Sequence, residues 1–228
     1  MNLLGLETSS TIGSVAVETP GSTLVREIAT PREQTAQILA LIDELLREAG
    51  IGLPDLNGIA FGRGPGSFTG LRVSVAVAQG LAAVAGMPLL PVSSLLCLAE
   101  RAWREHGCER ALVCVDAHMG EVYWALAERR GGVVGIAGDE RLGTPSDVTP
   151  PAAVAASAWF AIGSGFAAHA DALAAVRQTA AQVLPALVPS AVDLFPQAKR
   201  DLAAARVAAP TAALPVYLRE HTAWRRSS

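Results

Sequence analysis

Short runs of apolar residues open the chain, and their spacing predicts three strands followed by a helix. Residues 3–6 are apolar, residues 14–17 alternate after Gly13, and a third run through residues 24–25 follows Gly21, which is typical of a meander. Thr30, Pro31 and Glu33 then form a helix start, with a capping hydroxyl and a proline at the first helical position. The helix of residues 31–49 carries one apolar stripe, formed by Ile38, Leu41, Ile42, Leu45 and Leu46.

A second predicted helix, residues 67–85, has almost no polar face. It follows a buried strand at residues 57–61 and a Gly-Pro-Gly turn. On a helical wheel two apolar stripes lie nearly opposite each other: Leu71, Val75, Ala78, Ala82 and Ala85 on one, and Val73, Val77, Gly80 and Val84 on the other. One stripe can face the core of the chain. The other needs a second helix, and small residues allow close approach, so the pattern predicts a partner protein.

The opening pattern recurs in the second half of the chain. Residues 3–7 and 112–116 are both apolar runs ending in an acidic residue, and both are followed by a glycine and an alternating run. The repeat predicts two α/β domains of related topology, residues 1–105 and 106–228, joined near a helix at residues 95–105. Residues 159–162 read as a strand, and residues 145–158 as a loop with a short helix. Scattered prolines predict that the second domain is the smaller one. We also expect its last helix to pack back on the first domain.

Composition excludes several classes of function. The formal net charge is -3 without any long basic run, which argues against strong autonomous binding of nucleic acid. Three cysteines, without CxxC spacing, predict reduced thiols and no disulfide framework. The apolar stretch of residues 80–92 is short and interrupted by proline, so we expect no membrane span.

Two places invite a nucleotide or phosphate. Glu7, Thr8 and Ser9 close the first strand, and Asp116 occupies the matching place in the second copy, so these side chains are candidates to hold a magnesium nucleotide weakly; an ordinary polar turn is the alternative. The glycine-rich turn of residues 62–70 lacks the spacing of a dinucleotide fingerprint and the lysine of a P-loop, and we interpret it as a tight turn for packing. No HxxxH, HExxH or GxSxG motif predicts a metal site or a serine nucleophile.

Arg72 lies near the positive end of its helix, where a cation is disfavoured. We therefore expect a carboxylate partner, either Glu33 or Glu44 of the preceding helix or an acidic residue of another subunit, with simple solvation as the alternative.

Several blocks together resemble the bacterial TsaB (YeaZ) family. They are Glu7 to Ser9, Pro31 to Thr35, Phe61 to Arg72, Gln79 to Ala82, Asp116 to Trp124, and Pro215 to Arg219. The resemblance covers nearly the whole chain. It implies a two-domain actin-like or sugar-kinase-like fold of the ribonuclease H-like class, with the second domain reduced.

The resemblance also implies a role in making threonylcarbamoyladenosine beside the anticodon of tRNAs that read codons starting with A. There the chemistry belongs to a homologous, metal-binding catalytic subunit, TsaD, and a small ATPase, TsaE, joins the pair. Residues 92–98 lack the HxxxH motif of the catalytic relative, so metal-dependent catalysis is not carried over. Glu7 stands where aspartate is commoner in the family, and Gln34 where many members have histidine.

The resulting hypothesis is a non-catalytic, cytoplasmic scaffold without a cofactor of its own. It would bind the TsaD-type subunit through a four-helix interface, form a homodimer in isolation, and meet tRNA only through the complex. The candidate docking residues are Ile38, Leu41, Gly66, Phe68, Thr69, Gly70, Arg72, Val73, Val77 and Gly80. The alternative is a small ATPase or phosphotransferase that uses Glu7, Thr8, Ser9 and Asp116. A peptidase, a function found among fold relatives, has no motif to support it.

Overall fold

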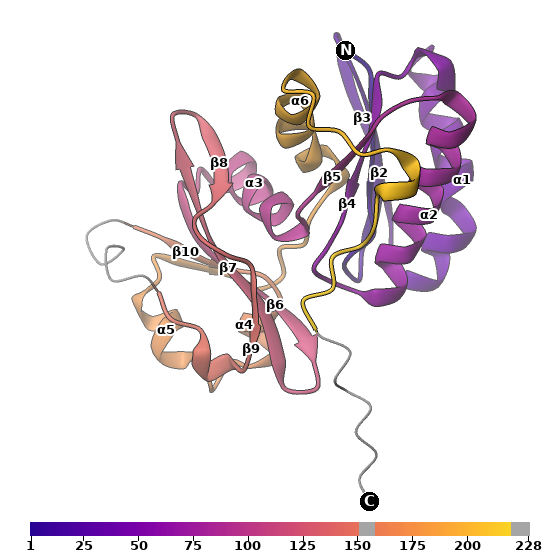
Figure 1. Cartoon of the computed structure of the whole chain (residues 1–228). Helices are drawn as coiled ribbons and strands as arrows, with labels where there is room; N and C mark the ends of the chain where they lie inside the picture. Colours follow the sequence, from indigo (N-terminus) through magenta and orange to yellow (C-terminus); the bar gives the residue numbers. More distant parts are fainter. Residues whose placement is uncertain (151–157, 220–228) are drawn as a thin grey trace, which may run out of the picture.

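The computed structural model describes residues 1–150 and 158–219 and contains two β-sheets (Figure 1). The first sheet has the strand order β3-β2-β1-β4-β5. β1 to β3 form the predicted antiparallel meander, and β4 and β5 add parallel to β1. The bounds are β1 Leu3–Glu7, β2 Gly13–Thr19, β3 Ser22–Ile28, β4 Gly58–Gly62 and β5 Leu89–Val92.

The second sheet repeats this arrangement. Its order is β11-β10-β6-β7-β8, with β9 paired to β7. Here too the first three strands are antiparallel, and β10 and β11 add parallel to β6, so β6 corresponds to β1 as the sequence repeat predicts. The bounds are β6 Arg110–His118, β7 Glu121–Arg130, β8 Val133–Ile136, β9 Arg141–Gly143, β10 Phe160–Ile162 and β11 Gln182–Leu184.

Helices cover the faces of both sheets in layers (Figure 1). α1 and α2 pack on one face of the first sheet, α3 and α6 lie between the two sheets, and α4 and α5 pack against the far face of the second. The bounds are α1 Pro31–Glu48, α2 Phe68–Ala85, α3 Ser94–His106, α4 Gly165–Ala168, α5 Ala174–Thr179 and α6 Phe195–Ala203. Short 3-10 helices lie at Leu53–Asp55, Pro145–Asp147, Ala191–Leu194 and Pro210–Ala212.

Helix ends follow the local sequence. The Thr30 side chain accepts the amide of Glu33 at the start of α1, and the Ser67 side chain accepts the amide of Gly70 at the start of α2, which satisfies amides that lack a partner within the helix. α2 ends at Gly86, whose φ of 66° is the left-handed conformation that glycine adopts without steric cost.

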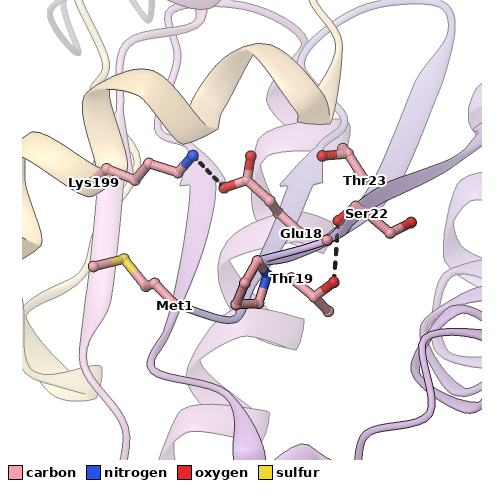
Figure 2. Close-up of a pocket in the computed structure, with 8 residues that line it drawn as sticks. Met1, Glu18, Thr19, Ser22, Thr23 and Lys199 are labelled. Atoms are coloured by element: carbon pink, nitrogen blue, oxygen red, sulfur yellow. Dashed lines mark hydrogen bonds and ion pairs between the residues drawn. The ribbon is translucent and has the colours of Figure 1, made fainter.

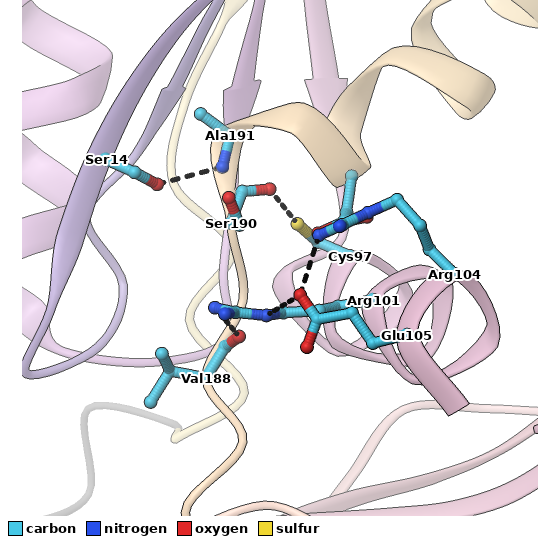
Figure 3. A network of polar contacts seen from close by, with 9 residues as sticks. Ser14, Cys97, Arg101, Arg104, Glu105, Val188, Ser190 and Ala191 are labelled. Atoms are coloured by element: carbon cyan, nitrogen blue, oxygen red, sulfur yellow. Dashed lines mark hydrogen bonds and ion pairs between the residues drawn. The ribbon is translucent and has the colours of Figure 1, made fainter. Parts of the chain in front are cut away.

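The layer between the sheets is tied together by polar contacts to residues 188–193 (Figure 3). Ser14 of β2 accepts the amide of Ala191 at 2.9 Å. From the α3 side, the Cys97 thiol donates to the carbonyl of Ser190 at 3.0 Å, and Arg101 donates to the carbonyl of Val188 at 3.1 Å. One segment therefore bonds to the first sheet and to α3, the helix that packs on the second.

α6 packs back on the first sheet. The Phe195 side chain is buried against Gly5 of β1, where an added Cβ would lie 3.1 Å from the ring. A helix from the second half of the chain thus packs on the first sheet, as we expected for the last helix. The division at residue 105 stays a prediction, because this central core includes residues of both halves.

Two further expectations can be compared with the fold. The short helix expected within residues 145–158 is the 3-10 turn Pro145–Asp147, and residues 151–157 lie outside the described part. α2 is long and apolar enough to cross a membrane by length and composition alone, which the expectation based on residues 80–92 overlooked. Its buried stripe packs against the sheet of the chain itself, as in a core helix.

Candidate functional site

α2 buries one of its two predicted stripes; of the other, Gly80 and Val84 are exposed and Val73 and Val77 are half-buried. Leu71, Val75, Ala78 and Ala82 pack on the first sheet and are buried. On the opposite side runs a surface that we call the α2 ridge. It consists of Thr69, Val73, Ala76, Gly80, Ala83 and Val84, of which only Val73 is half-buried.

The chain itself covers both flanks of α2. α1 packs beside it on one flank, and Val77 and Leu81 are half-buried against the core there. On the other flank lies the C-terminal segment of residues 213–219 (Figure 1), where the Gln79 side chain donates to the carbonyl of Ala213 at 2.8 Å. The α2 ridge is therefore the side of the helix that the described residues leave open.

Gly80, in the middle of the ridge, has no structural reason to be glycine in the part of the chain that the structure describes. A Cβ added there would meet nothing within 4 Å, and the backbone is not in the left-handed region. Glycine inside a helix costs about 0.5–1 kcal/mol relative to alanine. A close approach by another helix would account for it.

The predicted docking residues differ in exposure. Phe68, Thr69, Arg72 and Gly80 are exposed, and Val73, Val77, Leu41 and Gly66 are half-buried. Ile38 is 1% exposed and Gly70 is buried too, so these two belong to the chain's own core and loop packing. The apolar pattern did not single out Leu39 of α1, which is 58% exposed, because it lies outside the stripe that identified the helix.

The partner of Arg72 is aromatic. Its guanidinium lies 3.7 Å above the Phe68 ring, and its Nε donates to the Tyr217 hydroxyl at 3.4 Å. Glu44, one of the expected partners, instead binds Arg26 at 2.9 Å. The Glu44 prediction is wrong because β3 lies beside α1 and presents its own arginine. Cation–π stacking and the hydroxyl then take the place of a carboxylate.

The carboxyl end of β1 is closed. Glu7 is fully buried, with one carboxylate oxygen accepting the amide of Ser9 at 2.7 Å and the other the hydroxyl of Ser94 at 3.2 Å. Burial raises the pKa of Glu7 above its ordinary value, while the bonds from Ser9 and Ser94 oppose the rise. The Thr8 hydroxyl donates to the carbonyl of Gly70 at 2.6 Å. Glu7 and Thr8 therefore form hydrogen bonds within the chain itself, which is what the polar-turn interpretation expects.

The glycine-rich turn packs around these residues. A Cβ on Gly62 would lie 2.1 Å from the Glu7 carboxylate, and one on Gly66 would lie 2.6 Å from the carbonyl oxygen of Ser9. The amide of Ser67 donates to that same carbonyl at 2.7 Å. Gly62 therefore permits close contact with β1 and Gly66 with the residues that follow it, which supports the packing interpretation of the turn over a phosphate cradle.

Asp116 lies two residues before the end of β6, near the place that the repeat predicts, and has imidazole neighbours. Its Oδ1 lies 3.2 Å from Nε2 of His169, and its Oδ2 lies 3.2 Å from Nδ1 of His118. Its backbone amide donates to the Ser164 hydroxyl at 3.1 Å. The side chain is partly exposed. It can accept hydrogen bonds or orient an imidazole, and it stays a prediction as a nucleotide ligand.

Within residues 1–150 and 158–219, no group of three or more histidine, cysteine or acidic side chains is arranged to hold a metal ion; His221 lies outside this part. A shallow hollow of about 450 Å³ lies at the β2–β3 turn and is lined by Met1, Glu18 and Lys199 among others (Figure 2), so it is at the start of β1 and not at the carboxyl end that carries Glu7. It is bordered by an ion pair of Lys199 and Glu18 at 2.6 Å. This hollow contains none of the predicted site residues.

The fold and the open ridge define a class. The structure is a two-domain α/β protein of the actin-like and sugar-kinase-like type, with repeated sheets and a long, partly uncovered helix in its first half. Residues 26–223 match the family model described as TsaD: tRNA N6-adenosine threonylcarbamoyltransferase.

Relatives narrow the class. The chain is 36% identical over 230 residues to the tRNA threonylcarbamoyladenosine biosynthesis protein TsaB of Escherichia coli, covering 99% of this chain and 98% of that protein. A protein of the same name from Haemophilus influenzae is 44% identical over 130 residues, 57% of this chain and 55% of its own. YeaZ from Pseudomonas aeruginosa superposes with a TM-score of 0.86 at 37% identity, covering 95% of this chain and 99% of that one. The chain belongs to the TsaB (YeaZ) family.

Proposed function

We propose that this protein takes part in the biosynthesis of tRNA threonylcarbamoyladenosine as a non-catalytic partner of a TsaD-type catalytic subunit. The relatives carry the name of this pathway. The observation that carries the docking role is the α2 ridge: an exposed row of small side chains centred on Gly80, which nothing in the described chain covers.

The proposed interface is a four-helix contact. α1 and α2 of this chain meet the equivalent pair of a homologous subunit, with the α2 ridge at the centre. An interface that forms a stable complex buries on the order of 1,600 Å² in total. Without its partner the same surface would pair with a second copy of this chain, so a homodimer is expected in isolation. A TsaE-type ATPase would join the pair, and tRNA would be met only through the assembled complex in the cytoplasm.

The docking role is tested by placing a charge on the ridge. Ala76→Glu adds a carboxylate to an exposed position of α2 that docking would bury without a partner, so we expect co-purification with the TsaD-type subunit to be lost. The matched control is Ala167→Glu, which makes the same change at an exposed position of α4 in the other half. Both variants should unfold at the wild-type temperature. Equal retention of the partner by both would contradict the proposal.

The alternative of a small ATPase or phosphotransferase is tested separately by calorimetry with ATP and magnesium. The described bonds of Glu7 and Thr8 are to the chain's own amide, hydroxyl and carbonyl groups, so the isolated chain is expected to show negligible binding and hydrolysis. Tight binding, with hydrolysis that disappears in Asp116→Ala, would favour the enzyme instead.

A further inference from the structure

The last seven described residues, 213–219, connect α2 to the second sheet, and we call them the strap. The strap begins at Ala213, which is buried in the core beneath α1 and α2 and whose carbonyl accepts the Gln79 side chain at 2.8 Å. It then runs toward the N-terminal end of α2 without helix or strand structure (Figure 1).

The middle of the strap is held at the first turn of α2. The Tyr217 ring lies 5.5 Å from the Phe68 ring, and the Tyr217 hydroxyl accepts Nε of Arg72 at 3.4 Å. The amide of Val216 donates to the carbonyl of Arg63 at 2.8 Å. The guanidinium of Arg63 in turn binds Glu140 of the second half at 3.0 Å. The strap therefore passes through a point where the two halves already touch.

The end of the strap is fixed on the hairpin of β6 and β7. One guanidinium nitrogen of Arg219 donates to the carbonyl of Ala117 at 3.1 Å and binds the Glu121 carboxylate at 2.5 Å. The other lies 3.1 Å from the sulfur of Met119. Arg219 thus binds both strands of the hairpin and its turn.

This turn benefits from such support. His118, Met119 and Gly120 have φ angles of 60°, 57° and 80°, and the left-handed region is unfavourable for the two residues that carry a side chain. Hydrogen bonds from a charged donor are stronger than neutral ones. Arg219 therefore connects the β6–β7 turn, which has unfavourable backbone angles, to the strap, which contacts α2.

We propose that the strap is a positioning element, which couples the β6–β7 hairpin to the docking face of α2, with the Arg219–Glu121 ion pair as its latch. The inference rests on the proposed docking function, because it assigns the regulation of that same face. When the ion pair is formed, Tyr217 stays in contact with Phe68 and Arg72. These contacts stabilise the first turn of α2, which adjoins the ridge. When the ion pair is broken, the strap beyond Val216 is released and the first turn of α2 becomes less stable. Opening the latch would thereby lower the affinity of the α2 ridge for its partner.

The decisive variant is Glu121→Gln, because this residue lies on the hairpin and its described side-chain partner is Arg219. An effect on α2 that Glu121→Gln produces when Arg219 is intact, but that is absent when Glu121→Gln is added to Arg219→Gln, is then assigned to the strap and not to the contact of Arg63 with Glu140. Arg219→Gln opens the same latch from the other side and also loses the contacts with Ala117 and Met119, so the double variant should be no worse than Arg219→Gln alone if the two residues act as a pair. The matched control is Arg130→Gln, which removes an ion pair with Glu128 from the far end of β7.

Two measurements are made on the full-length chain. Hydrogen exchange reports on the amides of Val216 and of residues 71–74, and calorimetry gives the affinity for the TsaD-type subunit. We expect the latch variants, and not Arg130→Gln, to speed exchange at these amides and to weaken affinity by about fivefold, the lower end of typical coupling between sites.

Unchanged exchange would overturn the inference, since the strap would then hold nothing. Faster exchange with wild-type affinity would overturn it as well, because the strap would not act on docking. The ridge variant Ala76→Glu keeps these outcomes apart from the proposed function itself: if it abolishes binding while the latch variants do not weaken it, the docking face stands and the strap's coupling fails.

Discussion

Gly80 provides a prediction with opposite signs for folding and for assembly. Replacing it with alanine removes the cost of glycine in a helix interior and, because the added Cβ meets nothing within 4 Å, creates no clash in the chain itself. The free energy of unfolding of Gly80→Ala should therefore rise by about 0.5–1 kcal/mol. For a chain of this size that corresponds to a melting temperature higher by about 2–4 °C per kcal/mol.

Larger side chains at position 80 should weaken binding of the partner. A helix that packs on the α2 ridge needs the space above Gly80, and overfilling a packed contact costs about 1–3 kcal/mol. Gly80→Leu should thus weaken binding of the TsaD-type subunit by about 5- to 150-fold, since each 1.4 kcal/mol is a factor of ten. Gly80→Ala should weaken it less.

Thermal unfolding and calorimetry measure the two effects. Unfolding is followed at a concentration where the chain sediments as a monomer, so that self-association does not contribute. Gly135→Leu is the control, because Gly135 lies on β8, also has open space at its Cβ position and is not in the left-handed region. If Gly80→Leu and Gly135→Leu both bind like the wild type, the reasoning that reserves the ridge for a partner helix is refuted.

Three further results are expected. Gly62→Ala would place a Cβ 2.1 Å from the Glu7 carboxylate, so thermal or denaturant unfolding should show a loss of about 1–3 kcal/mol; wild-type stability would refute the close packing. Burial raises the pKa of Glu7 above 4.5, so the folded state holds this proton more tightly than the unfolded chain, and stability falls as pH rises from the unfolded value toward the folded one. Glu7→Gln should therefore gain on the wild type as pH rises, and a difference in unfolding free energy that stays constant from about pH 4 to pH 8 would contradict this. Burial also raises the pKa of the Cys97 thiol well above its usual range, that of Cys108 to about 11 and that of Cys114 to about 12; a thiol reagent at mildly alkaline pH should label them only on unfolding, and rapid labelling of the folded chain would argue against their burial.

Local patterns predicted much of the fold. The capped start at Thr30 and Pro31 gives α1, and the glycine after Ala85 ends α2, because such signals depend on a few neighbouring residues. The stripe of Leu71 and Val75 also faces the core. The repeat was visible because β1 and β6 play the same part in two sheets of equal strand order.

The contacts of the site depend on residues far apart in the sequence, which local patterns cannot specify. Arg72 has one partner within its own helix, the Phe68 ring, but the other is Tyr217, 145 residues later. Glu7 was recognisable as an acidic strand end. Glu7 is buried because the Gly62 turn packs against it and because Ser94 at the start of α3 bonds to its carboxylate. No sequence motif around Glu7 predicts these two contacts.

The side chains of the α2 ridge discriminate between the occupants it could have. A surface that binds lipid or a loosely fitting apolar partner would carry large aliphatic side chains, and a surface that faces water would carry charged ones. The centre of the ridge instead consists of the small residues Ala76, Gly80 and Ala83. Larger groups flank this centre: Val84, 84% exposed, ends the ridge, and Phe68, 54% exposed, stands just before the ridge at the start of α2. A low centre between larger groups suits a helix that crosses α2 at Gly80, because backbones can approach there before side chains collide. α1 and the strap on the two flanks then limit the direction from which such a helix can arrive.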